Sequence, residues 1–167
     1  GSSVSVSGDV VVVGSPYRYC PVGSNCGSAY VYRFMSGTWF EEATLTALNA
    51  APNDYFGRAV AVSRDKVIVG AQQNAYVYRF NPGAPGHWVL RAMPVASVWA
   101  SADSFGSSVS VGGNTAVVGA YYDYCRVPQG STYAGCGSAY VFALENVLFD
   151  CNSNGIPDET DIAGGTS

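Results

Sequence analysis

The fold is decided by FGSSVSVGGNTAVVGA at residues 105–120, because variants of this stretch occur three times in the chain. FGRAVAVSRDKVIVGA occupies residues 56–71, and GSSVSVSGDVVVVGS occupies residues 1–15 without the leading Phe. In each copy, an arm that alternates small residues with Val precedes an arm rich in β-branched residues. The alternation indicates a strand with one buried face, and the β-branched run indicates a strand covered on both faces. The pairs between the arms favour two-residue hairpin turns with positive φ; they are Gly8-Asp9, Arg64-Asp65 and Gly113-Asn114. Each copy therefore predicts a β-hairpin.

Two further strands are predicted after the hairpins. A third strand with Ala-Tyr-Val at its centre occurs in every copy, at residues 27–34, 74–80 and 137–142. A fourth strand that opens with Trp occurs twice, at residues 39–45 and 88–92. Four antiparallel strands in roughly 50 residues are the signature of a propeller blade, which buries its faces by stacking on neighbouring blades.

The predicted fold class is thus all-β, with three four-stranded antiparallel blades of the propeller type. The blades span about residues 1–48, 49–98 and 99–149, and residues 150–167 form a separate tail. The third blade is expected to be incomplete, because ENVLF at residues 145–149 is short and lacks the Trp.

These repeats resemble the FG-GAP repeats of integrin α-subunit propellers and of many secreted bacterial proteins. The resemblance rests on Phe-Gly, on the Ser-Val-Ser-Val arm, on Val-Val-Val-Gly-Ala/Ser and on Gly-Ser-Ala-Tyr-Val-Tyr, and it covers residues 1 to about 144. It implies a propeller scaffold, and such a scaffold hosts many activities. The acidic calcium loop of the integrin repeats is missing from all three copies.

Composition argues against several classes of partner and against catalysis. The net charge is −4 with only eight Lys and Arg and no basic cluster, so we expect neither nucleic acid nor an anionic membrane as partner. No apolar run is long enough for membrane insertion. The single histidine, His87, has no nucleophile motif beside it, and we expect no catalytic residues and no enzyme activity. Asp54 and Asp103 precede the Phe-Gly pairs and are expected to cap turns. Because the chain starts within a repeat and without Met, a processed or partial product is expected.

Four of the five cysteines flank the same loop in two different repeats. Cys20 and Cys26 do so in the first repeat, and Cys125 and Cys136 do so in the third, whereas the second repeat lacks both the cysteines and the loop. This paired loss predicts one local disulfide per loop and an extracellular, secreted protein. A site of four thiolates on a metal is the alternative, but the spacing is not that of a zinc ribbon. Cys151 is left over, as a free thiol or as a cysteine that bonds outside the chain.

The same two loops are rich in tyrosine, with Tyr17, Tyr19, Tyr121, Tyr122 and Tyr124. Exposed tyrosines offer a platform for sugar rings or for an extracellular protein. The alternative, which we favour, is that the rings cover the loop disulfides and the blade edges.

A calcium loop is predicted near the C-terminus, at residues 150–161 (DCNSNGIPDETD). Oxygen ligands for Ca²⁺ fall at alternate positions around Gly155; they are Asp150, Asn152, Asn154, the Ile156 carbonyl, Asp158 and Asp161. The stretch resembles a thrombospondin type 3 repeat and the first half of a bacterial dockerin. Pro157 and the short sequence after Ile162 fit the thrombospondin-like reading better.

The predicted function is that of an extracellular structural or adhesive module, stapled by disulfides and stabilised by calcium. Closed propellers need about four to eight blades, and exposed strand edges recruit further chains. We therefore expect a homo-oligomer or polymer that assembles head-to-tail into a ring or a filament. The alternatives are a carbohydrate-binding module that uses the Tyr-rich loops and a fragment of a larger secreted β-propeller protein.

Overall fold

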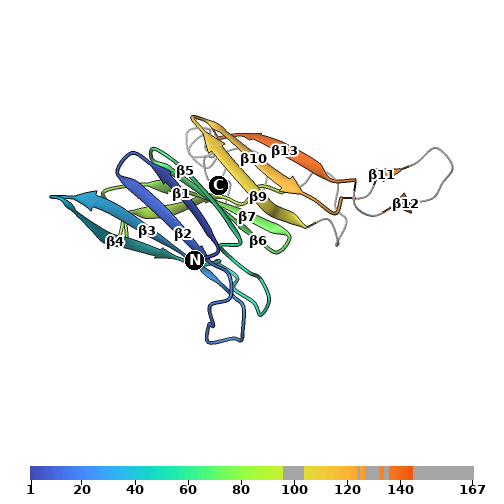
Figure 1. The fold of residues 1–167 in the computed structure, drawn as a ribbon, viewed down its shortest axis with the longest axis horizontal. Coiled ribbons are helices and arrows are strands. Elements are labelled where there is room, and N and C mark those ends of the chain that lie inside the picture. The colour runs from blue at the N-terminus through green and yellow to red at the C-terminus, as the bar shows by residue number, and fades with distance from the viewer. Residues whose placement is uncertain (96–103, 124, 127–131, 134–135, 145–167) are drawn as a thin grey trace, which may run out of the picture.

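The computed structural model describes residues 1–95, 104–123, 125–126, 132–133 and 136–144 (Figure 1). Strands and turns make up these residues, and no helix occurs among them. The strands of the first sheet are β1 (Ser3–Ser7), β2 (Val10–Ser15), β3 (Ser28–Met35) and β4 (Thr38–Leu45). Those of the second are β5 (Ala59–Ser63), β6 (Lys66–Ala71), β7 (Asn74–Phe80) and β8 (Trp88–Ala92). Those of the third are β9 (Phe105–Gly112), β10 (Thr115–Ala120) and β13 (Ser138–Ala143), and β11 (Cys125–Arg126) pairs with β12 (Thr132–Tyr133) in a separate ribbon.

Each of the three sheets is an antiparallel blade with strands in sequence order. We call them blades 1, 2 and 3. The predicted hairpins and their two-residue turns are confirmed, since Ser7 pairs with Val10, Ser63 with Lys66 and Gly112 with Thr115. The first turn residue has positive φ in every hairpin, at 59°, 54° and 55° for Gly8, Arg64 and Gly113. The fourth strands, β4 and β8, are confirmed in blades 1 and 2, while residues 145–149 lie outside the described residues.

The blades stack face to face, and the hydrophobic core lies between them (Figure 1). Strand β5 contacts β1 and β2 of blade 1, and β9 contacts β5, β6 and β7 of blade 2. One buried cluster fills the junction between blades 1 and 2, and a second fills the junction between blades 2 and 3. The two faces of a blade therefore differ. We call the face toward the preceding blade the leading face and the face toward the following blade the trailing face.

One expectation about the second arms holds only for blade 2. In β6, the run Val67–Ala71 is buried on both faces, but β2 and β10 alternate between buried and half-buried residues. The reason is stacking: β6 lies between two blades, whereas no described residue covers the leading face of blade 1 or the trailing face of blade 3. Stacking also explains the burial of the first arm of blade 1. Its Ser residues face blade 2, whereas its Val residues lie on the face without a neighbouring blade and are exposed.

No helix of a length and hydropathy that could cross a membrane occurs in the part of the chain that the structure describes.

Candidate functional site

In blades 2 and 3, the Phe-Gly pair lies between the aromatic rings of its own blade and the trailing face of the blade before it. Phe56 is fully buried, with its ring 5.1 Å from the Tyr76 ring and 6.4 Å from the Tyr78 ring. Gly57 approaches blade 1 so closely that Ser3 Oγ donates a hydrogen bond to the Gly57 carbonyl oxygen (2.8 Å). A Cβ atom on Gly14 would overlap that same carbonyl oxygen. The absence of a side chain at Gly14 is thus what lets the Phe-Gly backbone reach blade 1.

The tyrosine pair that backs Phe56 is itself anchored to blade 1. Tyr76 Oη donates to Asn49 Oδ1 (3.0 Å), and Tyr78 Oη donates to the Thr46 carbonyl (2.9 Å). Burial raises the pKa of Tyr76 to about 12, so the hydroxyl remains a donor at physiological pH. The pair therefore joins the strand β7 of blade 2 to the segment that leaves β4 of blade 1.

The loop before β3 completes the place that holds Phe56. Phe56 N donates to the Cys26 carbonyl (3.0 Å), and Tyr55 N donates to the Asn25 carbonyl (2.8 Å). A Cβ atom on Gly27 would overlap the Phe56 carbonyl oxygen, and one on Gly57 would overlap the Ser28 carbonyl oxygen. We call Gly14, Gly27 and Ser28, with the equivalent residues of the other blades, the Phe-Gly seat.

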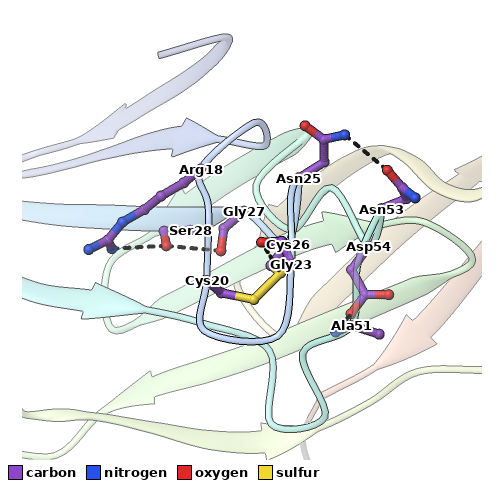
Figure 2. The surroundings of a disulfide bond; sticks show 10 residues. All are labelled: Arg18, Cys20, Gly23, Asn25, Cys26, Gly27, Ser28, Ala51, Asn53 and Asp54. Atoms are coloured by element: carbon purple, nitrogen blue, oxygen red, sulfur yellow. Dashed lines mark hydrogen bonds between the residues drawn. A yellow bond between two sulfur atoms is a disulfide. The ribbon is translucent and has the colours of Figure 1, made fainter.

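The Cys20–Cys26 disulfide, which the sequence predicted, is confirmed and closes the loop that lines this seat. Figure 2 shows it beside the segment that leads into Phe56, where Asn25 Nδ2 donates to Asn53 Oδ1 (2.9 Å). Asp54 Oδ2 accepts a hydrogen bond from Ala51 N (2.6 Å), which confirms the predicted turn cap, while Asp103 lies outside the described residues. The disulfide thus closes the receiving loop of blade 1, and hydrogen bonds hold the lead-in of blade 2 against that loop.

A second Phe-Gly seat, on the trailing face of blade 2, holds Phe105 and Gly106. The Phe105 ring lies 5.5 Å from the Tyr140 ring and 6.2 Å from the Phe142 ring. A Cβ atom on Gly70 would overlap the Gly106 carbonyl oxygen, as one on Gly14 would overlap that of Gly57. The two junctions therefore share one geometry.

The first strands also bond across the junction between blades 1 and 2. Val62 N donates to Ser5 Oγ (3.1 Å), and Arg64 N donates to Ser7 Oγ (3.3 Å). Ser5 thus satisfies an N–H group of β5, which is an edge strand of its sheet, and Ser7 satisfies an N–H group of the turn that follows β5. The small residues of the first arm are therefore contact residues of the trailing face.

A partly buried ion pair between β3 and β4 of blade 1 is contacted by Trp88 of blade 2, and sequence reasoning did not find it. Arg33 Nε and Nη2 donate to the two Glu42 carboxylate oxygens at 2.7 and 3.1 Å, and Trp88 Nε1 of blade 2 donates to Glu42 Oε2 (2.8 Å). The Arg33 guanidinium lies 4.6 Å from the centre of the Phe80 ring. Burial raises the pKa of Glu42, but the hydrogen bonds from Arg33 and Trp88 outweigh it and hold that pKa below its ordinary value. The sequence showed a Trp at the start of the fourth strand. It did not show that this Trp bonds to a carboxylate of the preceding blade.

His87 belongs to this junction as well. Its Nδ1 lies 3.8 Å from Glu42 Oε1, and its ring lies 5.7 Å from the Phe80 ring. These contacts give the histidine a packing role beside the ion pair.

The predicted tyrosine sites lie on two separate loops. Tyr17 and Tyr19 are exposed on the loop of blade 1, and the Tyr17 ring packs edge-on against Tyr55 at 5.9 Å. Tyr121 and Tyr122 follow β10 of blade 3 with their ring centres 4.0 Å apart, and their hydrogen bond raises the pKa of Tyr121. Tyr124 lies outside the described residues.

Several predicted sites cannot be placed. The six calcium ligands from Asp150 to Asp161 and Cys151 lie outside the described residues. Cys136 is disulfide-bonded, but the side chain of Cys125 lies outside the described side chains, so the Cys125–Cys136 pair stays a prediction. Within the described ranges, no group of three or more His, Cys, Asp and Glu side chains could hold a metal ion.

The chain was compared with known protein families and with curated proteins. No curated protein matches the sequence. The family model of the FG-GAP repeat matches residues 1–32, 39–81 and 88–142. The second and third matches begin in the fourth strand of the preceding blade, β4 or β8, and continue through the first three strands of the next blade. These matches cover most of the chain and include the Phe-Gly pairs and the glycines that receive them. The chain therefore belongs to the FG-GAP repeat family.

Proposed function

We propose that the chain is an extracellular, non-enzymatic structural or adhesive module that assembles with further copies of itself through its blade faces. FG-GAP repeats and an intramolecular disulfide are typical of extracellular proteins. One observation carries the proposal: the leading face of blade 1 and the trailing face of blade 3 are the two halves of the junction that occurs twice inside the chain.

The leading face of blade 1 supports this proposal by its exposed valines. Val4 and Val6 are 72% and 66% exposed, whereas the equivalent Val60 and Val62 of blade 2 are 8% and 7% exposed in the junction with blade 1. The same positions of blade 3, Val109 and Val111, pack against the second buried cluster. Contiguous exposed apolar residues of this kind mark interaction surfaces.

The trailing face of blade 3 offers the complementary half. Its Val141 is 69% exposed, whereas the equivalent Val31 and Val77 are 0% and 3% exposed beneath the next blade. Ser108 and Ser110 are exposed there, in the places that Ser3 and Ser5 occupy in blade 1. A second copy that lays its blade 1 on this face repeats the internal junction. Such a contact is head-to-tail, and it closes into a ring or continues as a filament depending on the rotation per copy.

Sedimentation velocity over a range of concentrations tests this proposal. We expect association of the unsubstituted chain that increases with concentration, and its loss in the double variant Val4→Lys/Val6→Lys. Both side chains are exposed in the single chain, so the thermal melting of the variant should match that of the parent at low concentration. A well-folded species of 17.4 kDa at every concentration would overturn the proposal.

The predicted calcium loop at residues 150–161 is proposed to stabilise the module, on the strength of its ligand spacing alone.

A second candidate function, carbohydrate binding, is favoured by the exposed Tyr121 and Tyr122 rings. A glycan array separates the two functions, because saturable sugar binding that is lost in Tyr121→Ala/Tyr122→Ala supports only the second candidate.

A further inference from the structure

A pocket of about 370 Å³ lies on the trailing face of blade 3, beside the ends of β9, β10 and β13. Its lining includes Ser108, Gly119, Ala120, Gly137 and Ser138. None of the described residues fills it. The pocket matters because every one of these residues has an equivalent in a Phe-Gly seat that is occupied.

The residues around the pocket align with those of the first repeat, and Gly119 also aligns with the second. Gly119 corresponds to Gly14 and Gly70, the glycines whose Cβ atoms would overlap an incoming glycine carbonyl. Gly137 and Ser138 correspond to Gly27 and Ser28, which contact Phe56 and Gly57.

Ser108 corresponds to Ser3, whose hydroxyl donates to the Gly57 carbonyl. The trailing face of blade 3 therefore carries the equivalents of Gly14, Gly27 and Ser28, which form a third Phe-Gly seat.

No backbone atom from another blade among the described residues packs against Gly119, the glycine at the centre of this seat. The three atoms nearest to a Cβ atom on Gly119 would all belong to Ser108, and the nearest of them is a hydroxyl oxygen that can rotate away. At Gly137 the nearest atom to a Cβ would be 3.5 Å away, an ordinary van der Waals distance. In the first two seats, the Phe-Gly backbone of the next blade occupies this space. In the third seat, none of the described residues occupies it.

We propose that this third seat binds an extended protein segment that presents Phe followed by Gly, supplied by the leading face of another blade of this family. The glycine must adopt positive φ, as Gly57 and Gly106 do at 89° and 85°, and the strand after it must present Val at alternate positions to cover Val141. This inference rests on the proposed self-assembly and specifies its chemistry. Gly1 aligns with Gly57 and Gly106. A second copy with this sequence therefore brings the glycine to the seat, and a Phe before that glycine completes the contact.

The test places a Phe in front of Gly1. One variant carries Asn-Asp-Tyr-Phe, copied from residues 53–56, in front of Gly1, and its control carries Asn-Asp-Tyr-Ala. Burial of one Phe side chain should tighten self-association about 10- to 100-fold in the first variant relative to the control, measured by sedimentation equilibrium. Adding Ser108→Ala/Gly119→Ala to the Phe-bearing variant should abolish this gain, because the new Cβ atom occupies the place of the incoming carbonyl.

The outcomes separate this inference from the proposed function. If the parent chain self-associates but the Phe-bearing and Ala-bearing variants associate equally, self-assembly stands and the Phe-Gly seat is overturned. If none of the chains associates, both proposals fail. Should the Ser108→Ala/Gly119→Ala variant melt at a lower temperature, hydrogen exchange in the Phe-bearing variant decides instead. Protection of the amides around Gly119 and Ser138 on association supports the seat, and unchanged exchange there overturns it.

Discussion

Blades 1 and 2 carry nearly the same first strand, yet that strand is exposed in one blade and buried in the other. Val4 and Val6 of β1 face solvent, whereas Val60 and Val62 of β5 pack against Val10 and Val12. Trp39 and Trp88 show the same contrast, with exposed fractions of 45% and 6%. Since the sequences are alike, the difference comes from the neighbour: a blade is half of an interface, and stacking completes it. The end blades therefore show which surfaces the repeat is built to cover.

The strongest test of this contrast is a charge placed at equivalent positions of the two blades. Val62→Lys should lower the free energy of unfolding by about 3–5 kcal/mol or prevent folding, because the ammonium would be buried without a partner between blades 1 and 2. Val6→Lys should change it by less than about 0.5 kcal/mol, since the side chain is exposed. Urea unfolding of both variants makes the comparison. Equal losses in the two variants would show that the leading face of blade 1 is covered in the isolated chain.

The glycines of the seats offer a milder contrast. Gly70→Ala should cost about 1–3 kcal/mol, because the new Cβ atom overlaps the Gly106 carbonyl and the packed blades must shift. Gly119→Ala should be nearly neutral, because only the rotatable Ser108 hydroxyl stands in the way. Neither glycine has positive φ, so the two variants differ in packing and not in backbone strain. Thermal melting of both variants at low protein concentration measures the difference, and a loss at Gly119 as large as that at Gly70 would contradict it.

A smaller effect is expected from the Arg33–Glu42 ion pair of blade 1, which Trp88 of blade 2 contacts. The pKa of Glu42 lies below its ordinary value of 4.5, so its ionised form stabilises the fold above about pH 4.5 and this contribution is lost as the pH falls through the lowered pKa. Glu42→Gln should lower the free energy of unfolding by about 1 kcal/mol at pH 7, with solvent screening taken into account. The gap between variant and parent should shrink below pH 4.5. A gap that is constant from pH 7 to pH 3 would exclude this electrostatic role.

The weakest interaction that we expect is calcium binding by residues 150–161. A single loop without a second loop to brace it should bind Ca²⁺ with a Kd of about 0.1–1 mM, as extracellular calcium modules do. Isothermal titration calorimetry should show one site in the parent and none in Asp150→Ala/Asn154→Ala. Binding that survives the double substitution would place the ion elsewhere in the chain.

Local sequence features predicted local structure well. Alternating Val and small residues, turn pairs such as Gly8-Asp9 and the paired cysteines Cys20 and Cys26 each act within a few residues, and the strands, turns and disulfide that they predict are present. The contacts between blades could not be predicted in the same way. Trp88 bonds to Glu42, which is 46 positions away, and no periodicity marks that partnership.

The burial of the second arms was mispredicted for a related reason. A run of β-branched residues indicates that a strand is suited to burial on both faces. Whether each face is buried depends on the presence of a neighbouring blade. Strand β6 has such neighbours, whereas β2 and β10 have a neighbour on one face only among the described residues.

The central claim, that the two end faces are the halves of one junction, is tested most directly by a disulfide between copies. Ser5 and Val62 are in contact across the internal junction, and their equivalents on the end faces are Ser110 and Val6. Under mild oxidation, the Ser5→Cys/Val62→Cys variant should form an intramolecular disulfide and show that the geometry permits one. A mixture of Val6→Cys and Ser110→Cys chains should then form a disulfide between copies, found by peptide mapping. Val22→Cys, exposed on a loop, should form none with Ser110→Cys. If the internal pair oxidises fully while Val6→Cys and Ser110→Cys chains stay as unreactive toward each other as the Val22→Cys control, the end faces do not join and the account is wrong.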